Sequence, residues 1–217
     1  MQIQNAIFDL DGTLIDSMPV WRNIQADAIE ENTGIKFTKA EREMCLQYPY
    51  FEALDKLRDK LPADCDRGYV YRQSMERMAK IYREGSIPFK PMAKEYLIYL
   101  KEHGYGVGLS TATPKALCVP YLKFTGVYDL FDCIFTEEEI KVSKSVGPAV
   151  YDASLEFLGG TKENTAIFED TLSCIRTCKK NGFYTVAIAE SLTPPEYLAE
   201  IKPLADRYIR SYKEMMN

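Results

Sequence analysis

The chain has 217 residues, of which 46% are hydrophobic and 27% are charged, a composition typical of a globular protein with a sizeable core. Its 27 basic and 32 acidic residues give a formal net charge of −5. This charge argues against nucleic acid or an anionic membrane as a partner, although a local basic pocket could still hold one phosphate group.

The N-terminal residues and the cysteines predict a cytoplasmic protein. The first eight residues, MQIQNAIF, lack the basic start, long apolar stretch and cleavage site of a secretory signal. No stretch approaches the roughly 20 apolar residues of a membrane-spanning helix. The six cysteines include no C-x-x-C pair, so we expect reduced, structural thiols. We also expect a monomer.

The only histidine, His103, lies in KEHG at the predicted end of a helix, where it suits the helix dipole. A single histidine argues against Ser-His-Asp or Cys-His catalysis and against histidine-rich zinc sites. Acid–base chemistry must then come from carboxylates, lysine or tyrosine.

The first predicted element is a short buried strand over residues 6–8, which ends in the polar turn DLDGT at 9–13. From about residue 17 the pattern changes to helical periodicity, as in residues 21–29 and 69–82. No strand-like alternation occurs before about residue 84. The segment therefore predicts a small helical bundle.

Strands and helices alternate in the rest of the chain. The predicted strands are 105–109, 131–135, 165–168 and 184–188, and the predicted helices are 92–101, one from Pro114, 148–158 and one ending at Lys180. Such repeated units predict a Rossmann-like α/β fold, with a parallel sheet and helices on both faces. Because the first strand belongs to this core, we predict a discontinuous α/β domain (1–16 and 87–217) interrupted by an all-α domain (17–86).

Polar residues follow the predicted strands at the edge where open α/β sheets bind ligands. They are Asp9, Asp11, Thr111, Lys144, Glu169 and Asp170. Four carboxylates in one place repel unless a cation neutralises them, and oxygen ligands without histidine or cysteine favour Mg²⁺. A hydroxyl, a lysine and free amides beside that metal favour a phosphoryl group. The edge therefore predicts phosphoryl transfer.

The motifs resemble those of the haloacid dehalogenase superfamily. The run DLDGTL at 9–14 resembles its first motif, and Thr111 matches its phosphate-binding hydroxyl. The run KSVGPAVY at 144–151 is similar to the lysine-then-proline start of a helix, and FEDT at 168–171 resembles the acidic fourth motif. The following residues, to 183, are similar to the beta-phosphoglucomutase-like branch, which also resembles phosphoglycolate phosphatases. The resemblance covers the whole chain, with residues 17–86 as a helical cap.

The resemblance implies roles for these carboxylates. Asp9 would attack phosphorus and form an aspartyl-phosphate. Asp11 would protonate the leaving oxygen and then deprotonate the attacking water. Asp9, the backbone carbonyl of Asp11, and Asp170 would hold Mg²⁺, with Glu169 as a direct or water-mediated ligand.

The resemblance also implies how the phosphate group is held. The hydroxyl of Thr111 and the backbone amides of Asp11 and Ala112 would bind its oxygens. Lys144 would offset the negative charge of both Asp9 and the phosphate. Charge stabilisation and alignment are the main contributions of a protein to phosphoryl transfer.

Each assignment has a structural alternative. An Asp-x-Asp-Gly run can be a surface turn or a calcium loop, although here it directly follows a predicted strand. Thr111 and the pair Glu169-Asp170 could cap helices. Lys144 lies four residues before Pro148, where the family's usual spacing is three. Lys141 is therefore an alternative to Lys144.

The second aspartate, Asp11, distinguishes phosphate-ester hydrolases and mutases from dehalogenases, because an alkoxide leaving group needs an acid and a halide does not. Beta-phosphoglucomutases carry a histidine shortly after the first motif, where this chain has Met18-Pro19-Val20-Trp21. We therefore expect a magnesium-dependent phosphatase acting on a sugar phosphate or a similar small metabolite. The alternatives are a phosphomutase or phosphotransferase, and a non-catalytic regulatory protein of the same fold.

Substrate choice is expected to lie in the helical segment, which would close over the site. Its candidate contacts are Trp21, Arg22, Tyr48, Tyr50 and Lys56. Aromatic residues at helical spacing are more often packing residues, so these five stay candidates.

Overall fold

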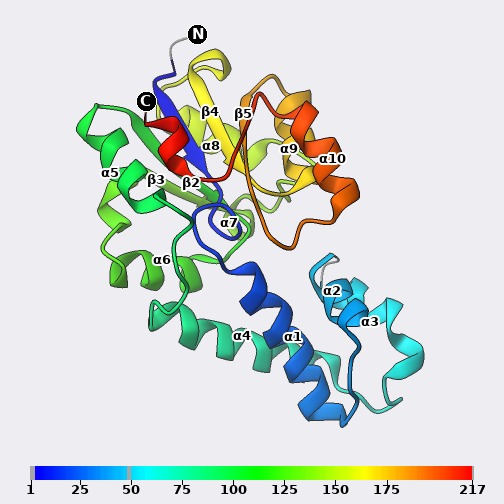
Figure 1. Ribbon diagram of the computed structural model, residues 1–217. Helices are drawn as coiled ribbons and strands as arrows, with labels where there is room; N and C mark the ends of the chain where they lie inside the picture. Colours follow the sequence, from blue (N-terminus) through cyan, green and yellow to red (C-terminus); the bar gives the residue numbers. More distant parts are fainter. Residues whose placement is uncertain (1–2, 48–49, 217) are drawn as a thin grey trace. The chain divides into compact units, whose positions relative to one another are not determined.

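The computed structural model describes residues 3–47 and 50–216 (Figure 1). Its sheet has six parallel strands in the order β3-β2-β1-β4-β5-β6. The strands are β1 (Asn5–Phe8), β2 (Gly106–Thr111), β3 (Cys133–Thr136), β4 (Thr165–Glu169), β5 (Tyr184–Ile188) and β6 (Arg207–Ile209). The predicted Rossmann-like parallel sheet is confirmed. The sixth strand was not predicted, because three residues are too few to show alternation.

Helices cover both faces of the sheet (Figure 1). The alternation along β1 sends Phe8 to one face, where its ring stacks on that of Phe168 at 4.4 Å. It sends Ile7 to the other face, into a buried cluster with Tyr151. The layer against Phe8 includes α5 (Ala93–Glu102), and the opposite layer includes α8 (Ala149–Phe157) and α9 (Leu172–Lys180). Burial of each such large side chain contributes about 1.5–3 kcal/mol to folding.

Further helical segments lie between the strands and after β6. They are α6 (Lys115–Phe124), α7 (Glu137–Ile140), α10 (Pro195–Leu204), and the 3₁₀ turns Tyr128–Leu130, Lys162–Asn164 and Tyr212–Met215. The helix predicted from Pro114 begins one residue later, because Pro114 has an extended ψ of 146°. The sequence analysis did not predict α7, which begins at a capping box formed by Thr136 and Glu139.

The contacts within the chain divide it into two compact units, Met1–Asp16 with Ile87–Asn217, and Ser17–Ser86. We call them the core unit and the helical unit. The helical unit contains α1 (Met18–Thr33), α2 (Lys39–Gln47), α3 (Tyr50–Lys56), the turn Arg58–Lys60 and α4 (Arg67–Arg83). Its helices share a small apolar core that includes Ile29, Leu54 and Val70.

The two segments that leave and re-enter the core unit lie side by side. The backbone N–H of Asp16 donates to the carbonyl of Pro88 at 2.9 Å, and that of Lys90 donates to Leu14 at 2.9 Å. The ammonium of Lys90 is buried and donates to Asp16 Oδ1 at 2.9 Å and to Glu190 Oε2 at 2.5 Å. This ion cluster fixes both segments to the loop that follows β5.

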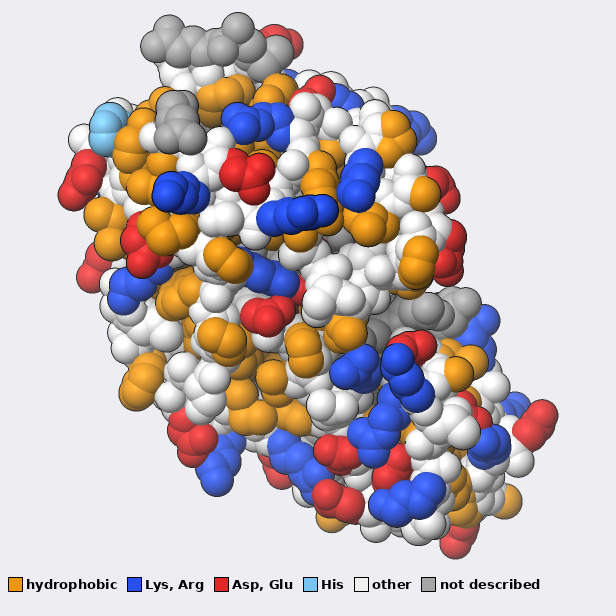
Figure 2. All heavy atoms as spheres, viewed as in Figure 1, with side chains coloured by type: hydrophobic (Ala, Val, Ile, Leu, Met, Phe, Trp, Pro, Cys, Tyr) orange, Lys and Arg blue, Asp and Glu red, His pale blue; other side chains and the backbone are white. Residues whose placement is uncertain are grey.

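Two further expectations concern the cysteines and membranes. All six cysteines are free thiols. Among residues 3–47 and 50–216, no helix is both long enough and apolar enough to cross a membrane. On the face drawn in Figure 2, acidic and basic side chains lie interspersed.

Candidate active site

The predicted site residues of β1 and β4 meet at the carboxyl edge of the sheet. These two strands are neighbours, and the N–H of Asp9 donates to the carbonyl of Phe168 at 3.0 Å, one residue beyond β1. Asp9 therefore lies beside Glu169 and Asp170, which end β4 and begin the next loop. The strands that follow β1 along the chain are added on one side of it, and those from β4 onward on the other. Open α/β sheets form their ligand crevice where the strand order reverses in this way.

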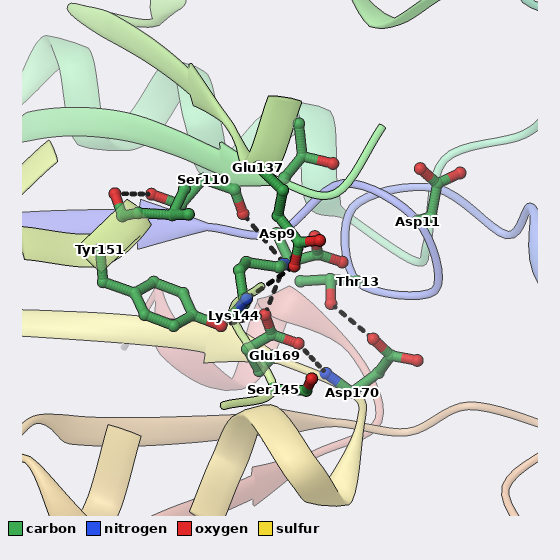
Figure 3. Close-up of polar contacts among 12 residues, drawn as sticks. Asp9, Asp11, Thr13, Ser110, Glu137, Lys144, Ser145, Tyr151, Glu169 and Asp170 are labelled. Atoms are coloured by element: carbon green, nitrogen blue, oxygen red, sulfur yellow. Dashed lines mark hydrogen bonds and ion pairs between the residues drawn. The ribbon is translucent and has the colours of Figure 1, made fainter. Parts of the chain in front are cut away.

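Three buried carboxylates form the centre of the site. Asp9, Glu169 and Asp170 are 6%, 1% and 4% exposed, and one oxygen of each lies within 4.8 Å of the others. Figure 3 shows these side chains turned toward one another. Buried negative charges at such separations repel strongly, so the arrangement requires positive charge nearby. We call these three residues the carboxylate cluster.

The ammonium of Lys144 supplies one positive charge to this cluster. Lys144 is 3% exposed, and its Nζ donates to Asp9 Oδ1, to Glu169 Oε1 at 2.7 Å and to the carbonyl of Ser110 at 3.1 Å (Figure 3). Burial alone would lower the pKa of Lys144, but the charges of Asp9 and Glu169 raise it well above its usual value. Lys144 therefore stays protonated, and it bonds to two of the three carboxylates.

The pKa values of two cluster members record this imbalance. Burial raises the pKa of Asp9 to about 7; Lys144 opposes the shift, and Glu169 and Asp11 add to it. Burial likewise raises the pKa of Asp170 well above its usual value, with Glu169 and Asp9 adding to the shift. A divalent cation would favour the ionised forms of both groups. The donor set, which contains only oxygen, suits Mg²⁺.

The first loop is shaped around Asp170. Gly12 has a left-handed φ of 82°, and a Cβ there would lie 2.4 Å from Asp170 Oδ2. Only glycine combines this backbone conformation with such a close approach. Thr13 is fully buried, and its hydroxyl donates to Asp170 Oδ1 at 3.1 Å. No pattern in the sequence indicates this bond.

The side chain of Asp11 lies apart from the carboxylate cluster (Figure 3). Its Oδ2 accepts a hydrogen bond from the hydroxyl of Thr113. Of the four carboxylates that we expected at this edge, three lie together. The side chain of Asp11 does not join them, because the turn of the first loop directs it toward the end of β2. Thr111, the last residue of β2, is buried and accepts a hydrogen bond from the N–H of Thr113 at 3.0 Å, while the neighbouring Ala112 is exposed.

The geometry distinguishes the two candidate lysines. Lys141 is exposed and follows α7 with a left-handed φ of 61°, whereas Lys144 reaches the carboxylate cluster. The loop that carries Lys144 is held by Glu137 Oε1, which accepts from the N–H of Lys144 at 2.7 Å and from the hydroxyl of Ser143 at 3.0 Å. A turn between Ser143 and Gly147 takes up the extra residue before Pro148.

Tyr151 is a residue that the sequence analysis did not connect with the site. It is fully buried on α8, and its hydroxyl donates to Glu169 Oε1 at 2.6 Å. The apolar pattern of α8 predicts only a core position for it. Tyrosine instead of an aliphatic residue at such a position indicates a buried hydrogen bond, because a buried phenol needs a hydrogen-bond partner. This was the sign in the sequence that Tyr151 has a polar contact.

The candidate substrate contacts lie in the helical unit. The rings of Trp21 and Tyr82 meet edge to face at 6.5 Å, and the ammonium of Lys56 lies 3.8 Å from Glu52. Arg22 is partly exposed. Tyr48 and the side chain of Tyr50 lie outside the described part of the structure. A role for any of the five in substrate binding stays a prediction.

Comparison with known proteins identifies the family. The family of haloacid dehalogenase-like hydrolases matches residues 6–188, so the chain belongs to this family. The chain is 24% identical to a phosphorylated carbohydrates phosphatase from Thermotoga maritima, over 94% of this chain and 93% of that protein. It is 27% identical to hexitol phosphatase B from Escherichia coli, over 93% and 91% of the two chains.

A solved structure has the same fold. Beta-phosphoglucomutase from Clostridium difficile superposes with a TM-score of 0.76 at 20% identity, covering 99% of this chain and 93% of that one. At this identity the likeness shows the fold alone. The predicted fold class and the predicted family resemblance are both confirmed.

Proposed function

We propose that the protein is a magnesium-dependent phosphatase that hydrolyses a small phosphorylated metabolite through an aspartyl-phosphate. The observation that carries this proposal is the carboxylate cluster, in which three buried acids share the single cation of Lys144 at the end of β1. The membership of a hydrolase family and the similarity to two named phosphatases support it.

Mg²⁺ fits the residues present. Asp9, Glu169 and Asp170 offer oxygens within 4.8 Å of one another and carry more negative charge than Lys144 balances. The backbone carbonyl of Asp11 is the further ligand that we propose. A bound Mg²⁺ would supply positive charge beside the phosphoryl group during its transfer.

Asp9 and Asp11 divide the chemistry in our proposal. A carboxylate oxygen of Asp9 attacks phosphorus, the ester P–O bond breaks, and Asp11 donates its proton to the leaving oxygen. Asp11 then takes a proton from water, the water oxygen attacks phosphorus, and the bond to Asp9 breaks to release inorganic phosphate.

The remaining predicted residues would hold the phosphate. The hydroxyl of Thr111 accepts from the N–H of Thr113, which leaves its own O–H proton for a phosphate oxygen. The backbone amides of Asp11 and Ala112 would donate to the other oxygens. Lys144, already bonded to Asp9, would balance the charge of the group that Asp9 attacks.

We further propose the class of substrate and the setting. The related proteins are named for phosphorylated carbohydrates and a hexitol, so a sugar phosphate or polyol phosphate is the class to test first. A cytoplasmic monomer without membrane or nucleic-acid partners is the setting that we propose for it.

The test is hydrolysis of p-nitrophenyl phosphate and of a panel of phosphorylated metabolites, with MgCl₂ or with EDTA. We expect phosphate release that requires MgCl₂, and a labelled phosphoenzyme after an acid quench. Failure to hydrolyse any substrate of the panel with MgCl₂ would contradict the proposal. Conversion of a bisphosphate-primed sugar phosphate to its isomer, without phosphate release, would instead identify a phosphomutase.

A further inference from the structure

The hydroxyl of Tyr151 is bonded to a charged member of the carboxylate cluster. A buried phenol needs an acceptor, and a backbone carbonyl would suffice. Tyr121 shows this ordinary solution, since its buried hydroxyl donates to the carbonyl of Ile87 at 2.7 Å. Tyr151 instead donates to Glu169 Oε1 at 2.6 Å, and both residues are almost fully buried. Its hydroxyl therefore acts on a group of the site.

The carboxylate of Glu169 is held at both of its oxygens. Its Oε1 accepts from the hydroxyl of Tyr151 and from the ammonium of Lys144, the latter at 2.7 Å. Its Oε2 accepts from the N–H of Asp170 at 3.3 Å. The ammonium of Lys144 also lies 5.7 Å from the centre of the Tyr151 ring. Together these contacts fix the rotation of the Glu169 carboxylate relative to Asp9.

The two donors to Oε1 differ in what else they must do. In the proposed function, the charge of Lys144 is shared among Asp9, Glu169 and the incoming phosphate group, so its bond to Glu169 weakens when substrate binds. Tyr151 carries no charge that a phosphate group could draw away, and its ring is packed with Ile7, Ile167 and Phe183 beneath the sheet. In the proposed function, its hydroxyl therefore remains bonded to Glu169 when the phosphate group binds.

We propose that Tyr151 is a positioning residue that holds Glu169 in the orientation needed to bind Mg²⁺ with Asp9 and Asp170. This inference rests on the proposed function, because it assumes a cation at the carboxylate cluster. Tyr151 itself touches neither the cation nor the substrate. Groups that orient metal ligands in this way commonly change metal affinity by 10-fold or more when they are removed.

The experiment compares MgCl₂ binding to the unchanged protein and to Tyr151→Phe, by titration calorimetry and by the rise of melting temperature with MgCl₂. This change removes one oxygen and keeps the ring. We expect Mg²⁺ affinity to fall about 10-fold, with kcat at saturating MgCl₂ largely retained. Tyr121→Phe is the matched control, since it removes an equally buried hydroxyl hydrogen bond and should leave Mg²⁺ affinity unchanged.

A double variant separates positioning from general support of the core. In a Glu169→Gln background, Tyr151→Phe should cause no further loss of Mg²⁺ affinity, because the residue through which it acts is already altered. Unchanged affinity in Tyr151→Phe, an equal loss in Tyr121→Phe, or a Tyr151→Phe protein that fails to fold would each overturn the positioning role alone. No binding of MgCl₂ to the unchanged protein would overturn the proposed function as well.

Discussion

Both units bury acidic groups, but the donors around Glu30 in the helical unit match its charge, whereas those around the carboxylate cluster of the core unit do not. Glu30 in α1 is 6% exposed, and its Oε1 accepts from Arg42 at 2.8 Å and from the N–H of Phe37 at 2.9 Å. Its Oε2 accepts from Lys36 at 3.0 Å. In the core unit, by contrast, the three acids of the carboxylate cluster share Lys144.

The pKa values of Glu30 and Asp9 shift in opposite directions. The hydrogen bond from Phe37 lowers the pKa of Glu30, whereas burial raises the pKa of Asp9 to about 7. A buried acid with matched donors has its desolvation offset, while buried acids in excess of their donors destabilise the fold, and a cation would relieve that cost. The difference between the two units is that Glu30 has matched donors, whereas the carboxylate cluster, which we propose as the cation site, has fewer donors than acids.

The largest expected effect is on turnover, and it belongs to the unbalanced cluster. Asp9→Asn removes the proposed nucleophile, so we expect phosphatase activity to fall by about 10⁴-fold or more. The melting temperature in EDTA should not fall, because a source of repulsion is removed as well. Asp27→Asn is the matched change in the helical unit, where Asp27 pairs with Arg42, and it should keep full activity. Activity that survives Asp9→Asn would refute the nucleophile assignment.

The second prediction concerns one paired cation in each unit, Lys144 in the core unit and Arg42 in the helical unit. Lys144→Met leaves three buried carboxylates without an ammonium, so we expect a loss of about 3–5 kcal/mol of unfolding free energy in EDTA. MgCl₂ should restore part of it. Arg42→Met leaves Glu30 with Lys36 and Phe37 as donors, so its cost should be about 1–2 kcal/mol, insensitive to MgCl₂. Urea unfolding measures both; equal costs would contradict the distinction between the units.

The third prediction concerns pH in the metal-free protein. The pKa of Asp9 rises from 3.8 to about 7 on folding. Between these two pH values, Asp9 is protonated in the folded core and ionised in the unfolded chain. The stability of the core should therefore decrease as pH rises from about 4 to 7. The pKa of Glu30 is lowered from 4.5, so its stabilisation is present above pH 4.5 and is lost as pH falls below it.

The two units can be followed separately in this pH series. The only tryptophan, Trp21, lies in α1, so its fluorescence reports unfolding of the helical unit. Amide exchange along β1 and β4 reports on the core. A pH dependence of the same sign for both signals would show that the raised pKa of Asp9 does not govern the core.

The smallest expected effect concerns backbone strain. Among the described residues, only Met92 and Lys141 combine a side chain beyond glycine with a positive φ, and both lie in the core unit. Met92→Gly should raise stability by about 0.5–1 kcal/mol, since relief of a left-handed conformation exceeds the entropic cost of glycine. Gly34→Ala, at a φ of 72° in the helical unit, should lower stability by a similar amount. Thermal unfolding of the two variants checks the opposite signs.

The fold and the chemical content of the site could be predicted because both follow local rules. An apolar strand followed by Asp9, and another followed by Glu169-Asp170, must meet if the strands are parallel neighbours. The observed pairing of β1 with β4 bears this out. The same local reasoning did not reach β6, whose three residues pair only with β5.

The hydrogen bonds of individual side chains could not be predicted from the sequence. Asp11 bonds to Thr113, which is 102 positions away, and Tyr151 bonds to Glu169 across two elements. Such partners depend on which atoms the packed fold brings within about 3 Å. The choice between Lys141 and Lys144 is of the same kind, because spacing along the chain does not reveal which lysine is aimed inward.

The paired segments at the edge of the core unit make the helical unit an exchangeable part. The backbone bond between Asp16 and Pro88 places the points where the chain leaves and returns next to each other. Lys90 fastens both points to the loop after β5. Evolution can therefore lengthen, shorten or replace residues 17–86 without moving a strand. Substrate choice, which we expect to lie in the helical unit, could then change while the carboxylate cluster stays in place.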